Sequence, residues 1–109
     1  MSEYRTSGKT TLTPDVLMTI ARMAALEVDG VCRMARVRSG RLLQRGNNGI
    51  RLVIEDNVVF IEMFLILNKD MNIRETGREV QQRVARAITE MTGLEVGHVN
   101  IHVEDIEYN

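Results

Sequence analysis

The sequence predicts an α+β domain of two layers, a small three-stranded sheet with two main helices on one of its faces. Three observations carry this prediction. Residues 72–91 place apolar side chains at steps of three and four, residues 50–67 alternate as two adjacent strands, and residues 96–104 alternate again. With a first helix in residues 14–28, the order is helix, strand, strand, helix, strand. The crossover through the second helix is expected to be right-handed if its two strands are parallel.

Composition limits the class of protein. A chain of 109 residues has room for one core, and a net charge of −1 gives no overall field that favours nucleic acid or an anionic membrane. Cys32 is the only cysteine, so an internal disulfide is impossible and a reducing compartment fits. The polar N-terminus does not resemble a signal peptide, and the longest apolar run, residues 58–67, is about half the ~20 residues that a membrane-spanning helix needs. We therefore expect a cytoplasmic protein without direct membrane insertion.

We expect a flexible N-terminal tail in residues 1–11, a single domain in residues 12–104, and a short acidic C-terminal tail in residues 105–109. Within the domain, residues 31–49 are expected to form a mobile basic loop, because no acid occurs between Asp29 and Glu55. Candidate contacts to a partner or to phosphate groups are the arginines of this loop and two on the second helix: Arg33, Arg36, Arg38, Arg41, Arg45, Arg74 and Arg78.

Both helices carry start signals. Thr13, Pro14 and Asp15 supply a cap, a proline for the first position and an acid near the positive end of the helix dipole. Asp70 or Asn72 can cap the second helix, and Gly93 suits the left-handed position after its end. The apolar stripe of the second helix is expected to comprise Ile73, Gly77, Val80, Val84, Ala87, Ile88 and Met91.

The strand in residues 58–67 is apolar on both faces, apart from Glu62. Two helices can bury only one of these faces, so the other needs cover. We expect self-association through this second face, with Val53, Phe60, Phe64 and Ile66 as candidate contacts. The competing interpretation is an ordinary core strand; Phe60→Glu separates the two, since a folded monomer indicates an interface and unfolding indicates a core.

Three stretches resemble the bacterial alkaline shock protein family, also called envelope stress response proteins, whose type member is alkaline shock protein twenty-three. They are residues 20–31, ending in Glu27-Val28-Asp29-Gly30-Val31; residues 79–93, with Val80-Gln81, Val84 and Met91-Thr92-Gly93; and residues 94–103, with Val96 and Val99-Asn100-Ile101-His102-Val103. The chain departs from the family pattern at Asn68-Lys69-Asp70-Met71, where the family often has Tyr-Gly, and in a longer, more arginine-rich basic loop.

The resemblance implies a small, non-enzymatic, cytoplasmic bacterial protein of envelope stress response or homeostasis. It implies a self-associating scaffold or adaptor, a homo-oligomer with a membrane-anchored partner protein, and it supplies no catalytic residue, cofactor or metal site. The polar face of the second helix, which includes Gln82 and Arg86, is a further candidate contact surface.

The remaining motifs have simpler interpretations. His98 and His102 are ~13 Å apart along a strand, too far to share a metal ion. Cys32 follows a helix end, whose negative dipole raises a thiol pKa, so an inert thiol is favoured. Gly46-Asn47-Asn48-Gly49 matches the G-x-x-G loop of KH domains, which makes an RNA- or DNA-binding module that uses the loop arginines the alternative function. A KH loop joins two helices, however, and this one precedes a strand.

Overall fold

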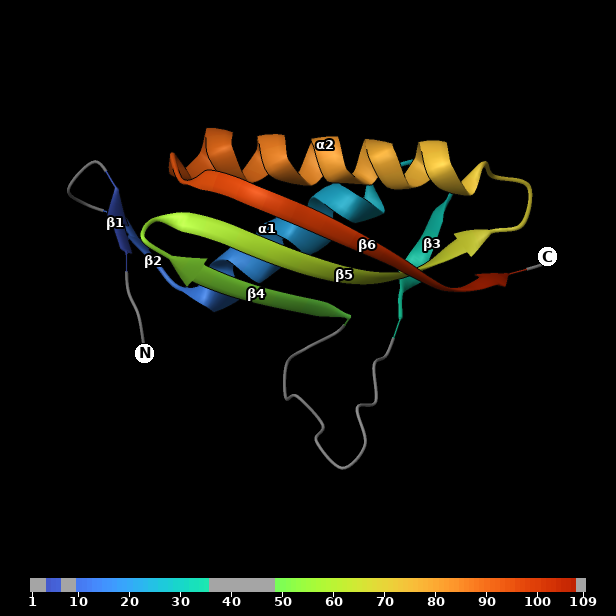
Figure 1. Ribbon diagram of the computed structural model, residues 1–109, viewed down its shortest axis with the longest axis horizontal. Coiled ribbons are helices and arrows are strands. Elements are labelled where there is room, and N and C mark those ends of the chain that lie inside the picture. Colours follow the sequence, from blue (N-terminus) through green and yellow to red (C-terminus); the bar gives the residue numbers. More distant parts are fainter. Residues whose placement is uncertain (1–3, 7–9, 36–48, 108–109) are drawn as a thin grey trace, which may run out of the picture.

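The computed structural model describes residues 4–6, 10–35 and 49–107. Two helices lie on one face of a twisted sheet, which gives the expected two-layer α+β architecture (Figure 1). The elements in chain order are β1 (Tyr4–Thr6), β2 (Thr10–Leu12), α1 (Pro14–Leu26), β3 (Val31–Met34), β4 (Ile50–Glu55), β5 (Val58–Asn68), α2 (Ile73–Thr92) and β6 (Glu95–Glu107). The predicted fold class and the order helix, strand, strand, helix, strand are confirmed, but among the described residues the main sheet has four strands and not the predicted three.

Strand β5 is the centre of the main sheet and pairs with three strands. Along one edge it runs parallel to β6 over its whole length. Its other edge is shared: β4 pairs antiparallel with residues 58–63, and β3 pairs antiparallel with residues 65–67. The main sheet is therefore mixed, with β6 at one edge and β3 and β4 end to end at the other.

The structure differs from the prediction at three places. Val31–Met34, expected to begin the basic loop, form strand β3, because the turn at Gly30 (φ +100°) returns the chain to the end of β5. Because this strand is only four residues long and contains Arg33, the sequence shows no clear alternation of apolar and polar side chains there. Tyr4–Thr6 pair antiparallel with Thr10–Leu12 instead of lying in a loose tail, and β6 continues three residues beyond the expected end at Glu104. The rest of the expected basic loop, residues 36–48, lies outside the described residues.

The hairpin between β4 and β5 turns at Asp56 and Asn57, as the sequence predicts. Both residues have left-handed backbone angles, φ +51° and +66°. A two-residue turn with two positive φ values matches the twist of antiparallel strands, and Asp and Asn tolerate that conformation better than most residues. The turn therefore sets the register that places Val53 opposite Phe60.

The expected cap residues bound both helices. The Thr13 hydroxyl accepts a hydrogen bond from the Val16 N–H (3.3 Å) at the start of α1. At the start of α2 the Asn72 side-chain oxygen accepts one from the Glu75 N–H (3.0 Å), and at its end Gly93 (φ +78°) donates its N–H to the Thr89 carbonyl. These contacts satisfy helix-end groups that otherwise have no partner in the helix.

The apolar face of β5 that meets the helices is sealed. Its five inward side chains, Val59, Ile61, Met63, Leu65 and Leu67, are at most 1% exposed. They pack in one cluster with residues of both helices, among them Leu17, Ala21, Val80, Val84 and Ile88. The predicted stripe of α2 is wrong at its two ends, because Ile73 and Met91 are 46% and 70% exposed.

Truncating this sealed face is expected to cost far more stability than truncating the outside of a helix. Ile61→Ala removes buried apolar atoms and leaves a cavity, so the free energy of unfolding should fall by about 2–5 kcal/mol in urea titrations. The control Met23→Ala, at a side chain 58% exposed, should change it by about 0.5 kcal/mol or less. Equal losses from the two substitutions would contradict the packing described here.

Candidate functional site: the outer face of the sheet

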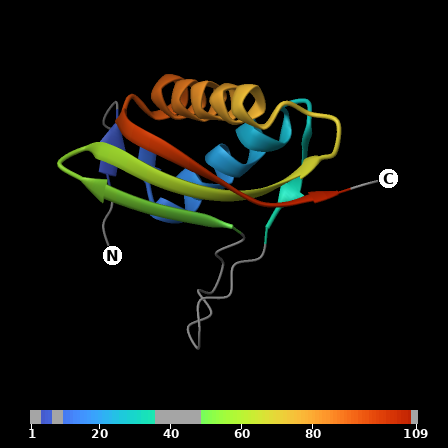
Figure 2. The ribbon, with the colours of Figure 1, turned by 45° about the vertical axis from the view of Figure 1, so that its right-hand side comes forward.

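The face of the sheet turned away from both helices is the candidate site. We call it the outer face; Figure 2 shows both helices on the opposite side of the sheet. Its side chains come from neighbouring positions of three strands, because residues at steps of two share one face. The outer face comprises Arg51 and Val53 of β4, Phe60, Glu62 and Phe64 of β5, and His98 and His102 of β6.

Three of the four residues expected to mediate self-association lie together on the outer face. Val53 is 53% exposed and sits directly across from Phe60 in the antiparallel pair, and Phe60 and Phe64 are partly buried. Ile66, the fourth, is only 7% exposed. In the register it lies between Arg33 of β3 and Asp105 of β6, so strands flank it on both sides. Ile66 is therefore not available as an open contact.

Each phenylalanine of the outer face packs against a histidine on the neighbouring parallel strand. The Phe60 and His98 rings are 5.0 Å apart between centroids and tilted by 54°, whereas the Phe64 and His102 rings are 4.6 Å apart and nearly parallel, at 13°. A Cβ at Gly97 would overlap the Phe60 ring, so glycine there lets the ring lie against β6. The rings are held in place, which gives the outer face a defined shape.

Glu62 lies between two basic side chains in the middle of the outer face. One carboxylate oxygen is 3.5 Å from the Arg51 guanidinium and the other is 3.6 Å from His102 Nε2. Arg51 also lies over the Phe64 ring, 5.9 Å from its centroid. These side chains are 35–48% exposed, so the Arg51–Glu62 ion pair is worth at most about 1 kcal/mol. Their main consequence is a surface with both signs of charge beside apolar carbon.

Sequence reasoning placed His98 and His102 outward but did not join them to the phenylalanines. The missing information was the parallel register, which pairs Phe60 with His98 and Phe64 with His102. The two histidines stack on different rings, and within the described ranges no three His, Cys, Asp or Glu side chains gather closely enough to hold a metal ion.

Three of the seven candidate arginines, Arg33, Arg74 and Arg78, lie within the described residues, and of these the structure brings together Arg74 and Arg78, one turn apart on α2. Arg33 is 2.5 Å from Glu107 and so has an intramolecular partner. The remaining four, Arg36, Arg38, Arg41 and Arg45, lie outside the described residues.

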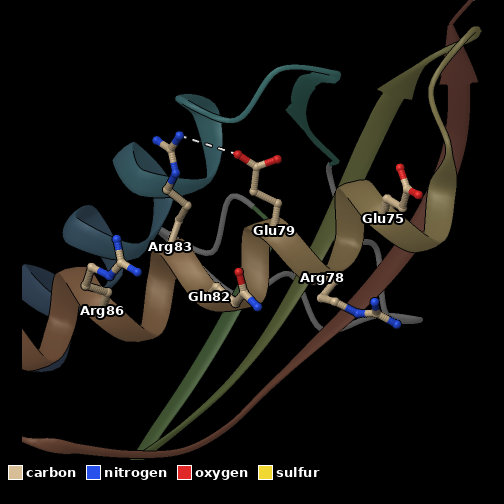
Figure 3. Close-up of a pocket in the computed structure, with 6 residues that line it drawn as sticks. All are labelled: Glu75, Arg78, Glu79, Gln82, Arg83 and Arg86. Atoms are coloured by element: carbon tan, nitrogen blue, oxygen red, sulfur yellow. Dashed lines mark hydrogen bonds and ion pairs between the residues drawn. The ribbon is translucent and has the colours of Figure 1, made fainter.

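The outermost surface of α2 is a mixed, solvated helix face. Arg83 contacts Glu79 (3.4 Å) one turn earlier and Glu27 beside α1 (3.9 Å). In Figure 3, Arg78 points away from the Arg83–Glu79 pair. A shallow depression of about 260 Å³ there is lined by Glu75, Arg78, Glu79, Gln82, Arg83 and Arg86. Opposite charges interleave along it, so it selects no particular sign of ligand.

Cys32 is partly buried and its thiol donates a hydrogen bond to the Glu107 carboxylate, at 2.8 Å. This bond and partial burial raise the pKa of the thiol, which outweighs the nearby Arg33. The sequence predicted the right direction for the wrong reason, since the cause is Glu107 of β6 and not the preceding helix end. In return, the Cys32 bond and then the Arg33 guanidinium lower the pKa of Glu107.

Removing the Glu107 charge is expected to make Cys32 more reactive. In Glu107→Gln the thiolate no longer faces a carboxylate, so iodoacetamide at pH 8 should alkylate Cys32 faster. The matched control Glu104→Gln should leave the rate unchanged. In the parent chain the stabilisation from ionised Glu107 is present above the ordinary carboxyl pKa and is lost as the pH falls through the lowered one. Glu107→Gln should remove this acid dependence, and an unchanged alkylation rate would contradict the assignment.

Gly49, the last residue of the G-x-x-G stretch, is required by the fold. Its φ is +78°, and a Cβ there would overlap the backbone carbonyl oxygen of Ala35. The Gly49 carbonyl accepts the Phe64 N–H (2.8 Å), and the Phe64 carbonyl accepts the Ala35 N–H (2.8 Å). The close approach of three backbone segments explains this glycine without a phosphate ligand.

Two glycines with the same φ separate conformational strain from lack of space. Gly93 also has φ +78°, but a Cβ there meets nothing within 4 Å. Gly93→Ala should cost about 1–2 kcal/mol of unfolding free energy for the left-handed conformation alone. Gly49→Ala should cost clearly more, because backbone must also move. Thermal unfolding of both variants makes the comparison, and equal losses would contradict the close approach.

Comparison with known proteins places this chain in a family. A sequence model of the alkaline shock protein twenty-three family, described as having a cell envelope-related function, matches residues 2–108. The chain belongs to that family. Among its relatives, the uncharacterized protein YqhY of Bacillus subtilis is 26% identical over 94% of this chain and 79% of its own length. The uncharacterized protein YloU of the same organism is 28% identical over 95% and 93%. The uncharacterized protein Spy1614 of Streptococcus pyogenes is 25% identical over 92% and 88%.

Solved structures of similar shape include variants of the MamM CTD. One copper-form variant has a TM-score of 0.57 at 13% identity, covering 87% of this chain and 100% of that one. A nickel-form variant has a TM-score of 0.55 at 12% identity, covering 85% and 99%. At this identity the likeness shows a shared fold only. Neither helix of the described residues is both long and apolar enough to cross a membrane.

Proposed function

We propose that this protein is a non-enzymatic scaffold or adaptor of the bacterial cell envelope, and that copies of it associate through the outer face of the sheet. The observation that carries the proposal is the exposure of that face. Its apolar side chains lie on β4 and β5, no described helix or strand packs over that face, and Val53 remains 53% exposed. Family membership supplies the envelope setting.

A second copy fits the outer face because the face is self-complementary. It carries the Arg51 cation and the Glu62 carboxylate within one cross-strand pair, next to the Val53 and Phe60 side chains. When two such faces meet, apolar area leaves water at about 25 cal/mol per Å², and charges of opposite sign are available on both copies. A shallow hollow of about 280 Å³ beside Val53, Phe60 and His98 offers a place for a side chain of the second copy.

In this proposal the protein is cytoplasmic and reaches the membrane through a separate, membrane-anchored partner. In the assembly the outer faces are buried against each other, so the helix layers of the copies face solvent. An adaptor needs a partner surface that stays open in the assembly, and the helix layer is that side of the molecule.

Charge at Val53 is expected to break the assembly without unfolding the chain. Val53→Glu places a carboxylate within the proposed contact, so multi-angle light scattering at high micromolar concentration should shift from oligomer to monomer. Far-UV circular dichroism should stay unchanged, because the side chain is already half exposed. The matched control is Met23→Glu on α1, at a side chain 58% exposed, which should leave the oligomer intact.

Three results decide the proposal. A monomeric parent protein at high micromolar concentration would overturn self-association. Equal disruption by Val53→Glu and Met23→Glu would move the interface elsewhere. Retention of RNA by the purified parent protein at moderate salt, lost when Arg36, Arg38 and Arg41 are changed to Ala, would instead favour the KH-like alternative.

A further inference from the structure

The groove between α2 and the free edge of β6 is a second surface, on the helix side of the sheet. It holds about 530 Å³, and its walls are Ile73, Arg74, Gly77, Arg78 and Gln81 of α2 with Ile101 and Val103 of β6. Figure 1 shows α2 running beside β6, which borders the sheet on that side. No described strand pairs with the outer edge of β6.

The β6 edge presents backbone groups that need partners. The Gln81 side chain donates a hydrogen bond from Nε2 to the Val99 carbonyl at 2.8 Å, so this carbonyl is within reach of α2. Backbone groups of a strand alternate between its two edges with a period of two. Ile101 and Val103 therefore turn their N–H and C=O groups to the same edge as Val99, beyond the point that Gln81 covers.

The floor of the groove is apolar, and one helix position beside it, Gly77, has no side chain. At Gly77 a Cβ would come within 3.9 Å of Ile101 Cγ2, which is ordinary contact, so space rather than strain is what the glycine provides. Ile73 at the end of the groove is 46% exposed, and Ile101 and Val103 are partly buried. Apolar side chains of a ligand can enter here at alternate positions.

The rim of the groove is positively charged. Arg74 and Arg78 lie one turn apart on α2, and no described acidic side chain forms an ion pair with either. Arg83, on the other side of the same helix, has two such partners. The groove therefore complements carboxylates on its ligand.

We infer that this groove binds an extended peptide segment of a partner protein, which adds as a strand to the β6 edge, puts apolar side chains over Gly77 and places acidic side chains beside Arg74 and Arg78. Strand addition between a sheet edge and a helix gives affinity through main-chain hydrogen bonds and specificity through alternate side-chain pockets. This inference rests on the adaptor role proposed above and assigns its partner surface, which lies on the opposite side of the sheet from the self-association face.

The test begins with a peptide-display selection of random heptapeptides on the full chain. The enriched peptides should alternate apolar and acidic residues, and a synthetic enriched peptide labelled with fluorescein then serves as the probe in fluorescence polarisation. The double variant Arg74→Glu/Arg78→Glu should weaken binding about tenfold or more. The matched control Arg86→Glu, on the outermost face of the same helix, should leave it within about twofold.

Two further measurements examine the floor and the edge. Gly77→Leu should fill the groove and abolish binding, whereas Gly77→Ala, which favours the helix, should stay folded and bind measurably. Backbone N-methylation of the peptide at alternate positions should abolish binding in one register, because strand addition needs those N–H groups. Light scattering of each variant separates a defect in the groove from a defect in self-association. A variant that loses peptide binding but keeps its oligomer is altered at the groove alone.

Four results would contradict the proposed peptide binding. A selection that enriches no peptide, binding unaffected by the Arg74/Arg78 reversal, or full affinity for both N-methylated registers would each overturn it. So would displacement of the peptide by single-stranded RNA at physiological salt, because the rim would then be a phosphate site.

Discussion

Strand β5 is the constraint on which the rest of the structure depends. It pairs along its full length with β6 on one edge and with β4 and then β3 on the other, so its backbone is the most completely paired in the main sheet. Its two faces have different environments, because both helices lie on one side of the sheet. The inward side chains are sealed, whereas the outward Phe60, Glu62 and Phe64 are only partly covered by neighbours in the sheet itself. This difference in burial follows directly from a two-layer fold that has an apolar strand at the centre of its sheet.

Specific side-chain contacts provide the partial cover of the outer face. Histidines and an arginine pack on the phenylalanine rings, and glycine at position 97 makes room for one of them. Such packing keeps aromatic carbon in a fixed arrangement that can still face another molecule, because both rings are only partly buried. The same face in a monomer would be under pressure to become polar. We therefore place association, and not catalysis, at the centre of the proposed function.

Much of the fold could be predicted from local patterns in the sequence. Thr13-Pro14, Asn72 and Gly93 bound the helices because capping depends on residues within one turn, and the Asp56-Asn57 turn depends on two. What the sequence left open was long-range pairing. Strand β3 is four residues long and becomes a strand only because β5 extends far enough to pair with it. The burial of Ile66, the Phe–His stacks and the bond from Cys32 to Glu107 all follow from register between distant strands, which a periodicity cannot specify.

Which face of the sheet meets a second copy is the point on which the proposed function depends. Selective labelling of valine methyl groups and phenylalanine rings, followed by nuclear magnetic resonance spectra over a dilution series, measures it at individual residues. The proposal predicts that the signals of Val53, Phe60 and Phe64 shift together as the protein is diluted, while those of the buried Val84 and of a labelled Met23 methyl stay in place. Shifts confined to the helix layer, or no shift anywhere between high micromolar and low micromolar concentration, would contradict it.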